Sequence, residues 1–256
     1  MSSDLEDVKR EVATANRVLA NLGLATGVTA ALGHASMRVP SEPNHFFVKG
    51  REYEFDALSI MEPDDMVLCD TEGFLIGGRP GLTQCSEVKI HACIYKTHPQ
   101  IQSIVHVHPR YTILVSVLTG SLKAMRQEGA QFLQRPLPIY PHVKTIQTDS
   151  EGMEVANLLG ESQAMLLRGH GAVTTGKSLS EAVMSMAQLE EQAQLNYLAY
   201  CAEGNNYTHL SDDLIDEMSN RAPLSEQPHF KDVLKGREPQ RDGTWNYQKR
   251  AASRIS

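Results

Sequence analysis

Residues 101–108 read Ile-Gln-Ser-Ile-Val-His-Val-His, and this stretch carries the clearest structural pattern in the chain. The run from Ile101 to Val107 is rich in β-branched residues and predicts a strand. Pro109 suits the first turn of a helix that continues to about Leu118. Side chains two residues apart on a strand point to the same face, so His106 and His108 can reach one ion.

A third histidine stands in the turn Arg168-Gly169-His170-Gly171, between the strand-like runs Ala164 to Leu167 and Ala172 to Thr174. The two glycines allow a sharp bend and a close approach of the backbone to a ligand. Three protein ligands with one open position are typical of a catalytic metal site. A His-x-His pair also occurs in proteins that bind no ion there. From the local pattern alone, these histidines are therefore either metal ligands or ordinary surface or core residues.

Helical patterns frame these strands. Residues 4–22 and 178–200 repeat apolar side chains at helical spacing. Ser86 is expected to cap a helix that runs toward residue 98. Glu87 then falls in its first turn, where a carboxylate is favoured by the helix dipole. His91, four residues on, shares the face of Glu87, and we expect it to support the site rather than to bind an ion.

Composition limits the classes of function. The chain has 256 residues, 41% of them hydrophobic and 21% charged, with a net charge of -7. That balance is ordinary for a globular protein and argues against nucleic acid or an anionic membrane as the main partner. No apolar run is long enough to cross a bilayer, and the N-terminal residues lack the apolar core of a secretory signal. The four cysteines form no CxxC pair, so we expect reduced thiols and a cytoplasmic protein.

Four blocks together resemble the class II aldolase/adducin head family, in order and in spacing. The resemblance covers roughly residues 8 to 205, and four blocks in order are more specific than one. The blocks are Gly33-His34-Ala35-Ser36-Met37-Arg38, Ser86-Glu87-Val88-Lys89-Ile90-His91-Ala92-Cys93-Ile94-Tyr95, Val105-His106-Val107-His108 and Arg168-Gly169-His170-Gly171.

This resemblance implies a fold and a site. The fold is α/β, a three-layer α/β/α sandwich with a central, mainly antiparallel sheet. His106, His108 and His170 match the metal ligands, one divalent ion (Zn, Mn, Co or Fe) per subunit. Glu87 matches the acidic residue that acts as acid or base and can approach the metal. Members are typically homotetramers with active sites at subunit interfaces.

Two positions depart from the phosphosugar aldolases. His34 stands where those enzymes usually have Asn, and Cys85 takes the first position of the Ser/Thr pair before Glu87. A thiol is a poorer partner for a phosphate than a hydroxyl. The variant is similar to a branch of metal-dependent decarboxylases of hydroxylated aromatic or pyridine dicarboxylates, such as dihydroxyphthalate decarboxylase. The segments 49–53 and 61–66 also look like that branch.

We therefore predict a lyase that removes carbon dioxide from such a carboxylate through a metal-stabilised carbanion or enolate. Glu87 or His34 is expected to return a proton to carbon, His34 alternatively binding the carboxylate. The other predicted substrate contacts are Arg38 and Lys49, for a second carboxylate, together with Ser36, Ser86 and Tyr140.

Other readings remain open. One is an aldolase or epimerase acting on a sugar phosphate, and another is oxygen-dependent chemistry at iron. A third is a non-enzymatic, adducin-like assembly module that has lost its metal. We expect the catalytic domain to span residues 1–227, and residues 228–256 to form a C-terminal arm or a frayed tail that could reach a neighbouring active site.

Overall fold

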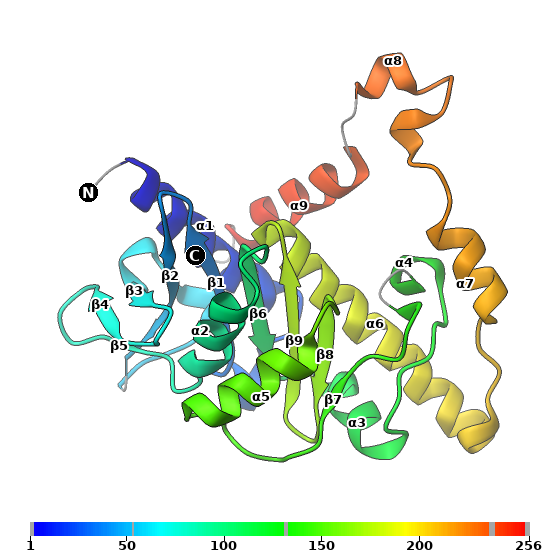
Figure 1. The fold of residues 1–256 in the computed structure, drawn as a ribbon, viewed down its shortest axis with the longest axis horizontal. Helices are drawn as coiled ribbons and strands as arrows, with labels where there is room; N and C mark the ends of the chain where they lie inside the picture. Colours follow the sequence, from blue (N-terminus) through cyan, green and yellow to red (C-terminus); the bar gives the residue numbers. More distant parts are fainter. Residues whose placement is uncertain (1–2, 53, 131–132, 236–238, 254–256) are drawn as a thin grey trace.

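The computed structural model describes residues 3–52, 54–130, 133–235 and 239–253 (Figure 1). Tyr53, which belongs to one segment of the resemblance, lies outside them. The strands are β1 (His34–Val39), β2 (Glu42–Arg51), β3 (Met66–Asp70), β4 (Leu75–Gly77), β5 (Thr83–Gln84), β6 (Ser103–Val107), β7 (Ile139–Tyr140), β8 (Ala164–Leu167) and β9 (Gly171–Gly176). The helices are α1 (Ser3–Asn21), α2 (Val88–Thr97), α3 (Arg110–Leu118), α4 (Gln127–Ala130), α5 (Asp149–Leu159), α6 (Leu179–Glu203), α7 (Asp212–Ser219), α8 (Lys231–Leu234) and α9 (Pro239–Ala252).

The strands form one sheet in the order β4-β3-β2-β1-β6-β9-β8-β7, and β5 pairs with β2. Every pairing in the described sheet is antiparallel except that of β7 with β8. The mainly antiparallel sheet that the resemblance implied is therefore confirmed. The predicted strand of residues 101–107 is β6, and it lies near the middle of the sheet.

Helices cover both faces of this sheet (Figure 1). On β2 and β6, neighbouring apolar side chains point alternately to opposite faces, because the period of a strand is two residues. Phe47 and Val105 join a core with α1 and α6, whereas Phe46 and Ile104 join a second core with α2 and α5. Two cores separated by one sheet make the three-layer α/β/α sandwich, and that prediction is confirmed.

β1 was not predicted as a strand, because its residues belong to a stretch, residues 28–39, that is rich in Gly, Ala and Ser. In the structure it pairs with β2 on one side and with β6 on the other. Its even-numbered residues lie on the face that α2 covers, since His34 and Ser36 both contact His91 of that helix. The position of β1 thus brings the Gly-His-x-Ser block next to the His-x-His block.

The prediction of a frayed tail is wrong for residues 239–252. They form α9, which packs against α1 and buries Trp245, only 7% exposed, in the core. Lys249 Nζ also lies 3.6 Å from Glu11 Oε1. Most residues of α9 are polar, so its sequence has little apolar periodicity, and its position depends on a few contacts made in the tertiary structure. The domain boundary at 227/228 stays a prediction.

Among the described helices, none combines the length and the apolarity that a membrane span requires.

Candidate active site

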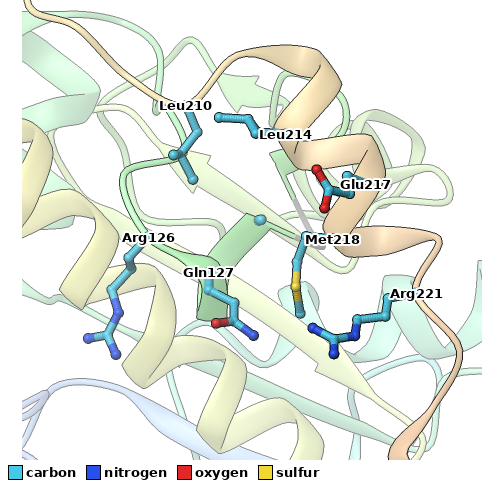
Figure 2. Close-up of a pocket in the computed structure, with 8 residues that line it drawn as sticks. Arg126, Gln127, Leu210, Leu214, Glu217, Met218 and Arg221 are labelled. Atoms are coloured by element: carbon cyan, nitrogen blue, oxygen red, sulfur yellow. The ribbon is translucent and has the colours of Figure 1, made fainter.

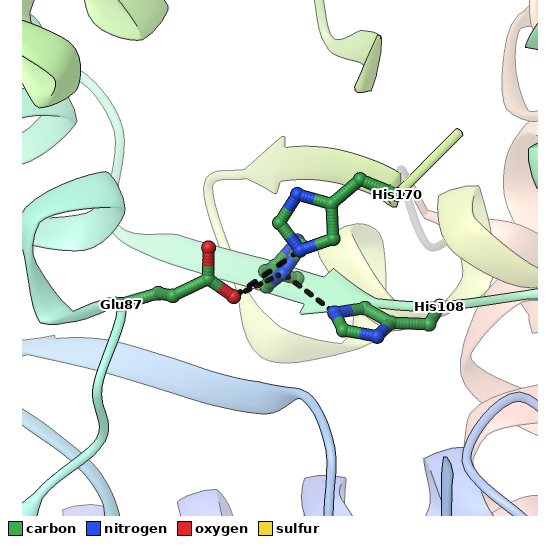
Figure 3. A group of neighbouring side chains, drawn as sticks. Glu87, His108 and His170 are labelled. Atoms are coloured by element: carbon green, nitrogen blue, oxygen red, sulfur yellow. Dashed lines mark hydrogen bonds and ion pairs between the residues drawn. The ribbon is translucent and has the colours of Figure 1, made fainter. Parts of the chain in front are cut away.

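Four side chains from separate parts of the chain converge at the end of β6. His106 is in β6, His108 follows the strand by one residue, His170 lies in the turn between β8 and β9, and Glu87 immediately precedes α2. Figure 3 shows the side chains of Glu87, His108 and His170 pointing toward one another. The structure therefore brings together the three histidines and the acid that the sequence singled out.

The distances within this cluster suit a metal ion. His106 Nε2 lies 3.0 Å from His108 Nε2, and Glu87 Oε2 lies 3.2 Å from His106 Nε2 and 3.3 Å from His170 Nε2. All four potential ligand atoms are within 4.8 Å of one another. Ligand atoms about 2.0–2.1 Å from a tetrahedral zinc ion would lie about 3.3 Å apart. The donor set of three imidazoles and one carboxylate is thus close enough together to hold one divalent ion.

A backbone contact orients the central imidazole. His106 Nδ1 lies 3.0 Å from the carbonyl oxygen of Ala172 in β9. The carbonyl can only accept, so Nδ1 carries the proton and Nε2 presents its lone pair to the cluster. Metal-binding histidines are commonly held in this way by their second nitrogen.

The electrostatic environment favours ligands without protons. Burial, followed by the neighbouring His106 and His170, lowers the pKa of His108 to about 3. Burial alone would raise the pKa of Glu87, but the neighbouring imidazoles of His106 and His170 outweigh it and hold this pKa far below its usual range, so its carboxylate is ionised. Neutral imidazoles beside an ionised carboxylate are the state in which these groups bind a metal.

The glycines of the fourth block, Arg168 to Gly171, have the roles expected of them. Gly169 has a φ of +63°, which other residues rarely adopt. A Cβ on Gly171 would lie 2.4 Å from the carbonyl oxygen of Val107 and 3.0 Å from His108 Cδ2. Only a glycine at position 171 lets β9 approach β6 this closely, and this approach places His170 beside His108.

Ser86 does not cap α2, and this prediction is wrong. The helix begins at Val88, and Glu87 occupies the N-cap position without bonding to the helix through its side chain. The carboxylate instead faces the imidazoles, and its Oε1 accepts a hydrogen bond of 2.9 Å from the backbone N–H of Ile146. Ser86 is exposed and accepts a hydrogen bond of 3.2 Å from Arg51 Nη1.

His34 lies next to the cluster without joining it. It is paired with His106 across β1 and β6, and their ring centroids are 5.3 Å apart. His34 Nδ1 is 2.6 Å from His91 Nε2, so His91 supports the site as expected. Burial, and then His91, lowers the pKa of His34 well below its usual value.

Two basic residues predicted to anchor a carboxylate have other partners. The guanidinium of Arg38 is buried and donates to backbone carbonyls, among them that of Tyr95 at 2.8 Å. Lys49 is also buried, and its Nζ lies 2.7 Å from a carboxylate oxygen of Asp56. Arg38 is therefore held in a structural role, which corrects the prediction, and the charge of Lys49 is neutralised by Asp56.

Two of the remaining predicted contacts also differ from expectation. Ser36 Oγ is fully buried and lies 2.6 Å from His91 Nδ1. Tyr140 is buried, and its hydroxyl donates a 3.0 Å hydrogen bond to Glu154 Oε2. Both hydroxyls are engaged by other side chains of the fold, so neither is placed to contact a substrate.

Arg51 is a residue that the sequence analysis did not single out as a substrate contact. Its guanidinium donates a hydrogen bond to Ser86, the residue that precedes Glu87. Arg51 lies two residues after Lys49 on β2, and the strand period predicts that both side chains share a face. This spacing was the signal by which the sequence could have identified Arg51.

A surface hollow of about 500 Å³ lies away from these residues (Figure 2). It is formed by α4, α7 and the segments beside them, and none of its lining residues belongs to the predicted site. These residues are Arg126, Gln127, Ala130, Leu210, Leu214, Glu217, Met218 and Arg221.

Residues 10–197 match the model of the Class II Aldolase and Adducin N-terminal domain, and the chain belongs to this family. A 3,4-dihydroxyphthalate decarboxylase from Rhodococcus jostii (strain RHA1) is 27% identical over 219 residues, which cover 82% of this chain and 87% of that protein. An L-fuculose phosphate aldolase from Methanococcus maripaludis is 31% identical over 144 residues, covering 56% of this chain and 74% of that protein.

A solved structure supports the same fold. The aldolase II superfamily protein from Pseudomonas syringae superimposes with a TM-score of 0.83 at 22% identity, over 99% of this chain and 95% of that chain. Decarboxylation and aldol cleavage both break a carbon–carbon bond, so the relatives indicate a lyase. The cluster of Glu87 and three histidines could bind the divalent metal on which such chemistry depends.

Proposed function

We propose that this protein catalyses the metal-dependent, non-oxidative decarboxylation of a hydroxylated aromatic or pyridine carboxylate or dicarboxylate. The observation that carries the proposal is the imidazole of His34 beside the cluster, 5.3 Å from His106 between ring centroids. The match with a dihydroxyphthalate decarboxylase over 82% of the chain supports it.

In this proposal His106, His108, His170 and Glu87 hold one divalent ion, for which Zn, Mn, Co and Fe are the candidates. When bound, the ion supplies Lewis-acid stabilisation of negative charge on substrate oxygens next to the breaking bond. With Glu87 as a fourth ligand beside the three histidines, a bound substrate would either displace this carboxylate or add to the ligands of the ion.

The reaction requires a proton donor. The bond between the ring carbon and the carboxyl carbon breaks, carbon dioxide leaves, and the electron pair that stays on the ring carbon takes up a proton. Both oxygens of Glu87 already face donors or ligand nitrogens. Among the described residues, no hydrogen bond occupies His34 Nε2. We therefore assign proton delivery to His34 and metal binding to Glu87.

Arg51 and Ser86 are proposed as contacts for a substrate carboxylate. Arg38 instead donates to backbone carbonyls, and Lys49 forms an ion pair with Asp56. An arginine suits a carboxylate because its guanidinium can donate two parallel hydrogen bonds. The hydrogen bond between Arg51 and Ser86 brings this guanidinium next to the residue that precedes Glu87.

Aldol cleavage of a sugar phosphate remains the alternative, and the similarity to fuculose phosphate aldolase favours it. The residues of the expected phosphate pocket give it less support. Cys85 is buried, and burial raises the pKa of its thiol, while Ser36 Oγ is bonded to His91. Neither residue is therefore placed to hold a phosphate.

We also propose a cytoplasmic homotetramer with its active sites at subunit interfaces. Light scattering of the purified protein tests the assembly, and a mass of four subunits is expected. A stable monomer with full activity would contradict it.

The first test measures release of carbon dioxide from a panel of ortho-hydroxylated aromatic dicarboxylates by metal-loaded protein. Release by wild type but by neither His108→Ala nor Glu87→Gln is expected. Retro-aldol cleavage of sugar phosphates without any release of carbon dioxide would reject decarboxylation in favour of the alternative. Purified protein without a stoichiometric metal, inactive on both panels, would indicate an assembly module.

A further inference from the structure

A chain of side-chain hydrogen bonds runs from the candidate active site into the interior. His34 Nδ1 lies 2.6 Å from His91 Nε2, and His91 Nδ1 lies 2.6 Å from Ser36 Oγ. Ser36 Oγ in turn lies 2.8 Å from the hydroxyl of Tyr95. All four residues are buried, so water does not compete strongly for these contacts.

The geometry selects one direction for the protons along this chain. A neutral imidazole carries one N–H, so His91 donates to one of its two neighbours and accepts from the other. Ser36 could accept from both His91 and Tyr95 only by leaving its own buried proton without an acceptor among the described residues. The favoured hydrogen bonds therefore all point toward His34 or all point away from it. If they point away, the hydroxyl of Tyr95 must donate to the carbonyl of Gln102, 3.5 Å distant. That distance is too long for a good O–H···O bond, whereas the 2.8 Å contact with Ser36 is ideal.

The favoured direction determines the tautomer of His34. Tyr95 donates to Ser36, Ser36 donates to His91 Nδ1, and His91 Nε2–H donates to His34 Nδ1. His34 Nδ1 is then an acceptor, and its single proton must be on Nε2. This nitrogen has no hydrogen-bond partner among the described residues, and the ring stands opposite His106 in the strand pairing.

We propose that His91 is a positioning residue, which holds the ring of His34 beside His106 and keeps the proton of His34 on Nε2. His34 thereby presents an N–H to the substrate. The inference rests on the proposed function, because it concerns the residue assigned there to deliver a proton. Its tautomer, however, can be observed without any substrate.

The chain orients His34 and does not supply it with protons. Burial raises the pKa of Tyr95, so its hydroxyl keeps its proton at neutral pH. Giving up the Nε2 proton would leave His34 as an imidazolate, which must regain a proton through Nε2, from solvent or from the hydroxyl of the next substrate. Both nitrogens of His91 form hydrogen bonds, one with His34 and one with Ser36. A side chain that replaces His91 must therefore still donate to His34 Nδ1 if the orientation of His34 is to be kept.

The experiment compares His91→Leu, which removes both hydrogen bonds, with His91→Gln, whose amide can still donate to His34. Tyr95→Phe removes only the hydroxyl that sets the direction of the hydrogen bonds toward His34. It tests the inference with His91 in place, in case the His91 variants fail to fold. His98→Leu is the matched control, because His98 lies at the other end of α2 and bonds the carbonyl of Ala156. All variants are first required to bind the same amount of metal as wild type.

The first readout is the imidazole ¹⁵N spectrum, in which the His34 resonances are identified by their loss in His34→Gln. We expect protonation on Nε2 in wild type and in His91→Gln, and a mixture of tautomers in His91→Leu and Tyr95→Phe. Protonation of His34 on Nδ1 in wild type would overturn the inference. This result stands whether or not the proposed substrate class is correct.

The second readout is steady-state kinetics on the decarboxylation substrate. General acid catalysis contributes roughly 10²- to 10⁴-fold, so His91→Leu should lower kcat by about 10²-fold with little change in KM. His91→Gln should recover most of this loss, and His98→Leu should keep the wild-type kcat. Equal kcat in His91→Leu and wild type would also overturn the inference.

Discussion

The two ends of α2 carry opposite charges and have different roles. A helix dipole favours an anion at the N-terminus and a cation at the C-terminus. Glu87 stands at the first end, and the guanidinium of Arg38, from β1, reaches the second. Both residues are buried, and both complement the dipole. Charge and burial alone would therefore rank them equally as functional residues.

Their remaining partners separate them. Within the described part of the chain, Arg38 donates to backbone carbonyls alone, those of Tyr95, Ile101, His98 and Pro43. Its guanidinium also lies 4.6 Å from the ring centroid of Tyr95. Glu87 accepts one backbone N–H but turns its other oxygen to two imidazoles. A charge at a helix end thus indicates chemistry where it meets other titratable side chains, and structural support where it meets only the backbone.

The largest effect is expected at the N-terminal end. His108→Ala removes one imidazole from the cluster, and an ion that supplies several kcal/mol of charge stabilisation is lost with it. We expect turnover to fall by at least about 10³-fold, since each tenfold corresponds to about 1.4 kcal/mol. Metal content and turnover measured together check this, with Arg38→Met as a variant that should keep its metal. Full metal content and turnover in His108→Ala would contradict the assignment of this cluster.

Arg38→Met probes the C-terminal end. It leaves buried carbonyls without a donor, and we expect the free energy of unfolding to fall by about 3 kcal/mol. Urea denaturation measures this as a lower midpoint at an unchanged m-value. Arg38→Lys should lose less, because it keeps one donor. If Arg38→Met instead lost its metal at wild-type stability, the contrast between the two ends would be wrong.

Gly171→Ala tests how closely the strands behind the cluster must approach. The added Cβ would meet the carbonyl oxygen of Val107 at 2.4 Å, so backbone has to move. Overpacking of this kind costs about 2 kcal/mol of unfolding free energy. Because His170 precedes this residue, metal affinity should also weaken, which a competition titration with a chelator measures. Gly243→Ala is the control, since nothing lies within 4 Å of its added Cβ.

The smallest effect is expected for Ser86→Ala. A true N-cap serine contributes about 1 kcal/mol, but α2 begins only at Val88 and Ser86 is exposed. The unfolding free energy should therefore change by less than about 0.5 kcal/mol. A loss of 1 kcal/mol or more in urea denaturation would restore Ser86 as the cap of this helix.

Local patterns predicted much of the fold. The helix expected over residues 4–22 is α1, and that expected from residue 178 onward is α6, where Ser178 does cap the helix. β8 has the predicted bounds, Ala164–Leu167. β1 and α9 escaped prediction because their residues lack a strong apolar period. They are stabilised by neighbours distant in the chain, β6 in one case and α1 in the other.

The sequence by itself identified the three histidines as candidate ligands. The strand period directs His106 and His108 to one face, a glycine-rich turn carries His170, and the family resemblance implied that the three meet. Only the tertiary structure decided which polar residues serve this cluster. The register of β1 against β6 places His34 opposite His106, and the packing of α2 on the sheet brings His91 to His34. Such contacts join residues far apart in the chain through packing of whole elements, and no local pattern of residues encodes them.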